Sequence, residues 1–113
     1  KNIDKGIRYL ERALARQPGN LSVMANLGAA YFHQGRLEEA AQLLEDVCSA
    51  NGQNLGALFN LAQIRDELGD RDRAIRLYRR FHDLAGGRPE FAQDLRKVRR
   101  RLKQLTGSKP PRR

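Results

Sequence analysis

The sequence lacks most of the features that mark secreted, membrane-spanning and disulfide-rich proteins. Its 113 residues include no tryptophan and a single cysteine, Cys48, which excludes an internal disulfide. No apolar run approaches the roughly 20 residues that a membrane-spanning helix needs, so no membrane span is predicted. No secretory signal is evident, but the chain begins with Lys1 rather than Met, and we expect it to be a processed or excised piece.

The residue patterns of common catalytic sites are also missing. The two histidines, His33 and His82, lie 49 positions apart and fall in different predicted helices. No carboxylate-histidine cluster has metal-ligand spacing, and no glycine loop suited to a phosphate occurs. Cys48 follows Val47 near the end of an amphipathic segment without an evident basic partner, which indicates packing rather than nucleophilic chemistry. We therefore predict no enzyme, no metal and no cofactor.

Positive charge is present in excess, and it is concentrated at one end of the chain. The formal net charge is +9. Residues 1–87 carry 12 basic and 11 acidic side chains, a balance of +1, whereas residues 88–113 carry 10 basic and 2 acidic side chains, a balance of +8. The body of the chain is nearly neutral on average, and the basicity belongs to its C-terminal part.

The chain repeats itself with a period of 34 residues. Asn20-Leu21 returns as Asn54-Leu55, and Asn26-Leu27-Gly28 returns as Asn60-Leu61-Ala62. A fixed period of this length, built from two helical patterns around a glycine, indicates an array of stacked helix pairs.

Apolar residues at helical spacing predict the individual elements. Asn20 is the expected N-cap of the second helix, Gly35 its end, and Pro89 the first residue of the last helix. The predicted helices cover residues 3–17, 21–34, 37–50, 54–68, 71–85 and 89–105.

Small residues mark the points where paired helices are expected to cross. Gly28 and Ala62 lie on the first helix of each pair, and Ala40 and Ala74 lie on the second. Two helices approach closely only where a side chain is nearly absent, with larger neighbours filling the flanking space.

These positions resemble the tetratricopeptide repeat family. The likeness rests on Leu27-Gly28, Tyr31, Ala40, Leu44 and Val47, and then on Leu61-Ala62, Ala74, Tyr78 and Phe81. One departure is Arg65, which replaces the tyrosine matched by Tyr31. The resemblance implies an all-α, right-handed superhelical solenoid of antiparallel helix pairs, with about two and a half repeats and a C-terminal capping helix. The expected parts are the second helix of a truncated repeat (1–20), full repeats (21–53 and 54–87), a basic capping helix (88–106) and a disordered basic tail (107–113).

The last predicted helix has one apolar and one basic face, as a cap should. Arg96 stands where the repeats have a small residue. The apolar stripe is Phe91, Leu95, Val98, Leu102 and Leu105. The basic surface is Arg96, Lys97, Arg99, Arg100, Arg101 and Lys103.

The resemblance implies a protein-binding scaffold whose first helices line a concave groove. Candidate peptide-binding residues on that face are Asn26, Ala29, Phe32, His33, Phe59, Asn60, Gln63, Asp66 and Glu67. The two asparagines would clamp a peptide backbone, or else merely tie neighbouring helices together. Phe32 and Phe59 would supply apolar pockets, and Asp66 with Glu67 an acidic end. A chaperone-type carboxylate clamp is disfavoured, since Gly56 and Asn60 stand where that subset has basic residues.

Two other partners remain open at this point. The basic surface of the last helix would suit nucleic acid or an anionic surface, although no aromatic residues interleave with it. Helix 3–17 has no preceding first helix of its own repeat to cover its apolar stripe, so we expect part of that stripe to be exposed and available for self-association.

Overall fold

The computed structural model describes residues 2–107, which are helical throughout apart from short connections and contain no strand. The disordered tail expected over 107–113 lies, from residue 108 on, outside the described residues. The elements are α1 (Asn2–Arg16), α2 (Leu21–His33), α3 (Leu37–Ala50), α4 (Leu55–Glu67), α5 (Arg71–Ala85), the short 3-10 helix η1 (Pro89–Phe91) and α6 (Ala92–Leu105).

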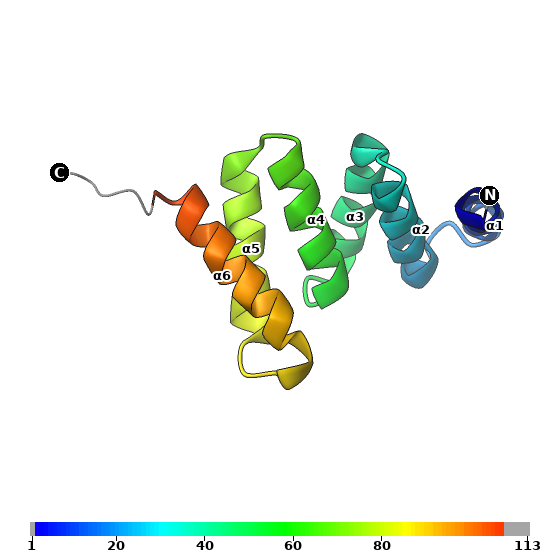
Figure 1. Ribbon diagram of the computed structural model, residues 1–113. Coiled ribbons are helices and arrows are strands. Elements are labelled where there is room, and N and C mark those ends of the chain that lie inside the picture. The colour runs from blue at the N-terminus through cyan, green and yellow to red at the C-terminus, as the bar shows by residue number, and fades with distance from the viewer. Residues whose placement is uncertain (1, 108–113) are drawn as a thin grey trace.

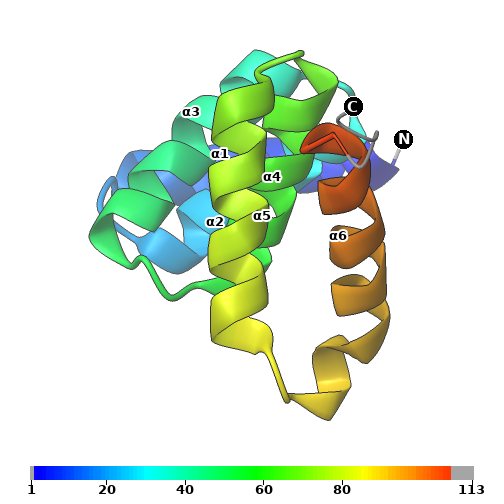
Figure 2. The ribbon, with the colours of Figure 1, turned by 90° about the vertical axis from the view of Figure 1, so that its left-hand side faces the viewer.

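The helices follow one another along an elongated array of 55 × 27 × 25 Å, with α1 at one end and α6 at the other (Figure 1). Helices α2 and α3 form one antiparallel pair, and α4 and α5 form the next. Helix α6 runs beside α5 at the C-terminal end (Figure 2). The predicted helix-pair architecture is therefore confirmed.

Equivalent residues begin and end the paired helices. The side-chain oxygen of Asn20 accepts a hydrogen bond from the backbone N–H of Val23 at 3.1 Å, and Asn54 accepts one from Ala57 at 3.0 Å. Each asparagine satisfies a donor that the first helical turn leaves unpaired, which confirms the expected N-cap. Gly35 and its repeat equivalent Gly69 have φ of +84° and +82°, the left-handed conformation that glycine adopts without strain.

The small residues lie at the helix crossings, as the sequence predicts. Ala40, Ala62 and Ala74 are all 0% exposed. At Gly28 there is no room for a side chain, because a Cβ atom there would lie 2.8 Å from Cγ of Leu44, whose side chain is itself fully buried. The absence of a side chain on α2 is therefore what lets α3 approach so closely.

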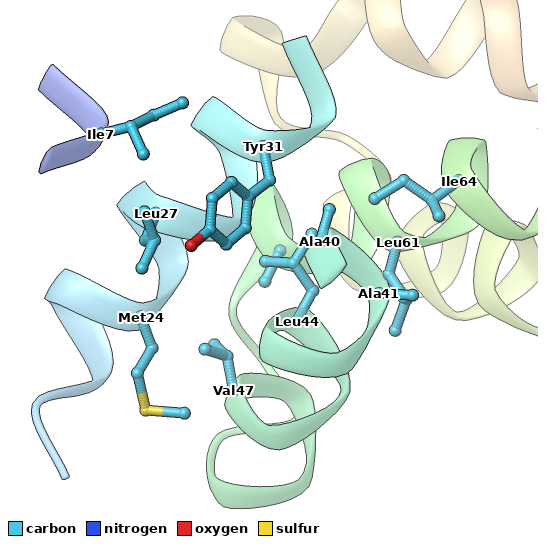
Figure 3. Packing of buried hydrophobic residues seen from close by; sticks show 11 residues of the cluster. Ile7, Met24, Leu27, Tyr31, Ala40, Ala41, Leu44, Val47, Leu61 and Ile64 are labelled. Atoms are coloured by element: carbon cyan, nitrogen blue, oxygen red, sulfur yellow. The ribbon is translucent and has the colours of Figure 1, made fainter. Parts of the chain in front are cut away.

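The core consists of two neighbouring hydrophobic clusters. The first joins α1 through α4 and is seen from close by in Figure 3, where Leu27, Leu44 and Leu61 lie among its members. The second joins α4 through α6. Leu77 and the half-buried Cys48 pack against both clusters, and burial raises the pKa of the Cys48 thiol to about 11. A thiol held protonated in this way fits the packing role expected for Cys48.

The beginning of the last helix differs from the prediction of one helix over 89–105. Residues 89–91 form the 3-10 turn η1, and the α-helix begins at Ala92. The backbone of Phe91 (φ −107°, ψ 12°) departs from α-helical geometry, and its ring packs edge-on against Phe81 with centroids 5.7 Å apart. Docking this ring on α5 competes with continuing the helix through Phe91. The apolar stripe predicted for the rest of the helix is confirmed, since Leu95, Val98 and Leu105 are buried.

The N-terminal helix is better covered than the sequence suggested. Ile7 is 4% exposed, and Leu10 and Leu14 pack against the first cluster, because α2 lies across this face. Only Ile3 and Tyr9 are exposed large apolar residues on α1 within the described part, at 40% and 71%. The surface available for the self-association considered above is correspondingly small.

The close approach at Gly28 predicts opposite effects for the same substitution at two helical glycines. Gly28→Ala should lower the free energy of unfolding by roughly 1–3 kcal/mol, because Leu44 has no room to move. Gly6→Ala on α1, where a Cβ would meet nothing within 4 Å, should raise it by up to about 1 kcal/mol through helix propensity. Urea denaturation followed by circular dichroism measures both. If Gly28→Ala stabilised the protein as much as Gly6→Ala does, the packing argument would be wrong.

Candidate functional site

A hollow of about 330 Å³ lies between α2 and α4, the first helices of the two full pairs. Three of the candidate peptide-binding residues, Asn26, Ala29 and Asn60, line it. The complete lining is Ser22, Ala25, Asn26, Ala29, Asn54, Gly56, Ala57 and Asn60. The two asparagines that recur at the repeat period thus lie on the same hollow.

The two asparagine side chains are available for a ligand. Asn26 is exposed and Asn60 half-buried, and within residues 2–107 neither side-chain amide is hydrogen-bonded to another residue. The alternative, in which they only tie neighbouring helices together, has no such bond to support it. The capping asparagines Asn20 and Asn54, by contrast, have their side-chain oxygens engaged. An amide offers two donors and an acceptor, which matches the groups of a peptide backbone.

Small residues keep the hollow open between these amides. Ala25, Ala29 and Ala57 contribute only methyl groups, and Gly56 none. A Cβ added at Gly56 would meet only Oδ1 of Asn54, at 3.7 Å, so the surface here is roomy rather than closely packed. A ligand could therefore bring its main chain close to the helices.

The aromatic candidates have other contacts. Phe59 is half-buried and packs against Phe81 in the second cluster, with ring centroids 5.1 Å apart. Phe32 packs against the first cluster and stacks on His33 at 5.9 Å. Neither ring is among the residues lining the hollow. The expectation that they supply apolar pockets for a ligand is therefore weakened, because much of each ring is used in the fold.

Asp66, a candidate for the acidic end of the groove, is instead part of a structural network. Arg101 on α6 donates to both of its carboxylate oxygens, from Nε at 2.7 Å and from Nη2 at 2.8 Å. The hydroxyl of Tyr78 on α5 also donates to Oδ2 of Asp66, at 2.9 Å. The Asp66 side chain is only 14% exposed, and the hydrogen bond from Arg101 holds its pKa below the usual value. Asp66 thus joins α4, α5 and α6, and offers a ligand no unpaired charge.

This network also changes the role expected for Arg101. The sequence placed it on the solvated basic surface with Lys97 and Arg100, because helical spacing alone cannot show which arginine reaches a neighbouring helix. The pair lies 35 residues apart, one more than the repeat period, so the period gives no signal for it. Of the other candidates, Gln63 is half-buried and Glu67 exposed.

The arginine that departs from the repeat pattern makes a contact equivalent to that of the tyrosine it replaces. The Tyr31 hydroxyl donates to Oε2 of Glu11 at 2.6 Å, and Nη2 of Arg65 donates to Oε2 of Glu45 at 2.7 Å. Both members of the second pair lie 34 residues beyond those of the first. Each contact links the first helix of a pair to the second helix of the preceding pair, so the substitution preserves an interhelix tie.

The acidic and basic side chains of the nearly neutral part of the chain, residues 1–87, are concentrated on different helices. Helix α3 carries Glu38, Glu39, Glu45 and Asp46 and no basic residue. Helix α5 carries five arginines, at positions 71, 73, 76, 79 and 80, against two aspartates. Averaging over residues 1–87 conceals this separation, which leaves an acidic helix and a basic helix in one array.

Two further results concern metals and membranes. Among residues 2–107, no group of three or more His, Cys, Asp or Glu side chains is arranged to hold a metal ion. In the same range, no helix combines the length and the apolar character required to cross a membrane.

Comparison with known proteins identifies the repeats. The family model described as a tetratricopeptide repeat matches residues 1–47 and again residues 33–93. No curated protein matches the chain. Among solved structures, MamA of AMB-1 is 30% identical with a TM-score of 0.79, and the match covers 95% of this chain and 61% of that chain. The chain therefore spans less than two thirds of this relative.

Two more distant structures share the fold and contain peptides. The type III secretion chaperone SycD of Yersinia enterocolitica, in complex with a peptide of the translocator YopD, is 15% identical with a TM-score of 0.86; the match covers 96% of this chain and 83% of that chain. The first repeat domain of Spaghetti (RPAP3), bound to an HSP90 peptide, is 22% identical with a TM-score of 0.75 and covers 89% and 80%.

The network around Asp66 predicts a stability effect that depends on pH. Arg101→Gln should lower the free energy of unfolding by about 1 kcal/mol at neutral pH, since Arg101 is partly exposed and solvent weakens the pair. The Asp66 carboxyl has its pKa lowered from 3.8 in the folded state, so its contribution is present above that value and is lost as the pH falls through the folded pKa. The difference from the unaltered protein should therefore shrink in acid. Arg100→Gln, an equal loss of charge on α6, is the control, and an equal effect from it would contradict the prediction.

Proposed function

Because the chain belongs to the tetratricopeptide repeat family, a family of protein-interaction scaffolds, we propose that it holds an extended peptide segment of a partner protein in the hollow between α2 and α4. The proposal concerns binding rather than catalysis. It rests mainly on one observation: Asn26 and Asn60 line the same hollow with amide groups that no other described residue uses.

The spacing of the two amides suits an extended main chain. They occupy equivalent positions of successive repeats, so their separation follows the packing of neighbouring first helices, typically about 8–10 Å. An extended chain rises about 3.3 Å per residue, so this separation corresponds to roughly three residues of peptide. One amide would then contact the backbone of a residue near the beginning of the segment, and the second would contact it about three residues further on.

Backbone recognition of this kind favours shape over sequence. A carboxamide can donate to a carbonyl and accept from an N–H whatever side chains the segment carries. The small side chains of Ala25 and Ala29, and the absence of one at Gly56, would let the peptide main chain approach the helices as closely as such contacts need. We infer that side-chain selectivity is supplied at the margins of the hollow, where the exposed Ser22 lies.

The structures of relatives support a peptide ligand without identifying it. SycD and the Spaghetti repeat domain were solved with peptides bound, but at 15% and 22% identity they share only the fold with this chain. An acidic chaperone C-terminus is not the ligand we propose, because Gly56 and Asn60 carry no positive charge for its carboxylates. The engagement of Asp66 by Arg101 also compensates one of the two charges, Asp66 and Glu67, that would have favoured a basic segment at that end.

Peptides selected from a random displayed library on the unaltered protein would test the proposal. Each backbone hydrogen bond contributes about 0.5–1.5 kcal/mol, so the double variant Asn26→Ala, Asn60→Ala should bind such peptides about tenfold or more weakly in fluorescence anisotropy. Gln42→Ala is the matched control, since Gln42 is an exposed amide on α3 outside the hollow. Its affinity should be unchanged.

The same peptides distinguish the groove from the basic surface of α6. If binding survives the asparagine double variant and is lost in Arg99→Gln, Arg100→Gln, the groove assignment is wrong and an adaptor acting through α6 is favoured. Arg101 is left in place in this comparison because its removal would also disturb the Asp66 network.

A further inference from the structure

A second hollow lies where α3, α4 and α5 meet, and it is strongly basic. Its volume is about 380 Å³, and it is lined by Glu45, Arg65, Arg73, Arg76, Leu77 and Arg80. Four guanidinium groups face one carboxylate here, which leaves a charge of +3 on the lining side chains. Leu77, which packs against both hydrophobic clusters, is its one apolar lining residue.

Two of the arginines are held in place by the protein. Nη2 of Arg65 donates to Oε2 of Glu45 at 2.7 Å, and Nε of Arg80 donates to the backbone carbonyl of Gly52 at 3.0 Å. A Cβ at Gly52 would lie 2.6 Å from Nη2 of Arg80, so the glycine provides the space in which that guanidinium sits. Side chains fixed in advance lose less conformational freedom when they bind a ligand.

The donors of these arginines are not all used. Nε of Arg65 is buried and has no hydrogen-bond acceptor among residues 2–107, which is uncommon for a buried polar atom. The Arg65 side chain as a whole is 17% exposed. It therefore combines one satisfied donor, one orphaned donor and a place on the wall of the hollow.

The two remaining arginines are only loosely engaged. Arg73 is exposed and approaches the half-buried Asp70 only at the long distance of 3.7 Å, and Arg76 has no ion pair within the described residues. Both lie on the same hollow as Arg65 and Arg80. Four arginines so arranged repel one another, and an anion among them would remove that cost.

We propose that this hollow binds a phosphate monoester group. The planar guanidinium fork matches the oxygens of a phosphoryl group, and a dianion with three terminal oxygens can accept from several arginines at once. A single carboxylate has fewer oxygens and half the charge. The volume leaves space for the group that carries the phosphate, with Leu77 available to its apolar part.

The surroundings favour a compact anion over a nucleic acid strand. The hollow is bordered by α3, which carries four acidic residues and no basic one. An extended polyanion crossing α3 would be repelled by those carboxylates, whereas a single phosphate beside Arg76 and Arg80 would not reach most of them. Arg76 and Arg80 also border a neighbouring hollow with Arg79, and the proposed site differs from it in adding Arg65 from α4.

This site is separate from the peptide hollow. Arg65 follows Asn60 by five residues on α4, which places it about 140° further around the helix axis. The two hollows share no lining residue. A substitution of a lining residue in one hollow therefore removes no lining side chain from the other.

The test is a titration followed by NMR of the arginine Nε–Hε groups. The probes are inorganic phosphate and O-phosphoserine, compared with sodium chloride at matched ionic strength. The signals of Arg65 and Arg80 should shift and saturate with one ligand per chain. Shifts with both probes indicate that a free phosphate suffices, and shifts with O-phosphoserine alone indicate a phosphorylated side chain. Shifts that do not saturate, or that chloride reproduces, would overturn the proposal.

Substitutions on α5 separate a specific site from general charge. Arg76→Gln should weaken O-phosphoserine binding about tenfold or more, since Arg76 lines the hollow and supports no other described contact. Arg71→Gln removes the same charge from the same helix outside the hollow and outside the neighbouring one that Arg76 and Arg80 also border, so it should change the affinity less than about twofold. Equal weakening by both variants would show that only net charge matters.

Two further measurements complete the test. A single-stranded oligonucleotide should be displaced from α5 by O-phosphoserine if it binds there at all. If it binds α5 and is not displaced, the proposal is wrong, and α5 is a general polyanion-binding surface instead of a phosphate monoester site. The double variant Asn26→Ala, Asn60→Ala should bind O-phosphoserine with the same affinity as the unaltered protein. The peptide proposal can therefore fail while the phosphate proposal is confirmed, and the phosphate proposal can fail while the peptide proposal is confirmed.

Discussion

The whole array depends on the close approach of paired helices where a side chain is nearly absent. At Gly28 the Leu44 side chain occupies the place that a Cβ would take, with only 2.8 Å between that position and Cγ of Leu44. Ala40, Ala62 and Ala74 are 0% exposed at the related crossings. Because each pair packs closely, its larger side chains reach the next pair, and two clusters arise that share Leu77 and Cys48. Both hollows described above are surfaces of this packing, one formed between first helices and the other where three helices meet.

Polar contacts then fix how successive pairs sit on one another. Tyr31 binds Glu11 between α1 and α2, and Arg65 binds Glu45 between α3 and α4, so a neutral hydrogen-bond donor and a cation serve equivalent interfaces of successive repeats. At the C-terminal end, Arg101 and Tyr78 both bind Asp66, which joins α6 to α4 as well as to α5. Since Asp66 is only 14% exposed, its negative charge is compensated within the fold. The last helix is thus both an apolar cover for the second cluster and a partner in an ion pair.

The two hollows differ in the chemistry they present because they belong to different helix faces. Between α2 and α4 lie neutral amides and small side chains, which suit the uncharged groups of a main chain. Where α3, α4 and α5 meet, guanidinium groups gather around one carboxylate, which suits a compact anion. Under the two proposals, the chain would hold a peptide segment on one face and a phosphate monoester on another. The separation arises because α4 contributes Asn60 to the first hollow and Arg65 to the second from nearly opposite sides.

The sequence by itself determined the repeat period, the helix pairs, the crossings at small residues and the N-cap at Asn20, because these features are local or recur at a fixed spacing. It also indicated that Asn26 and Asn60 share a face, since equivalent positions of stacked repeats align. Only the tertiary structure decided which charged side chains pair between helices. Arg101 reaches Asp66 and Arg80 reaches the Gly52 carbonyl across distances in the chain that follow no period. Such contacts depend on how long side chains extend from packed helices, and that is set by the relative placement of the helices rather than by the spacing of residues along any one of them.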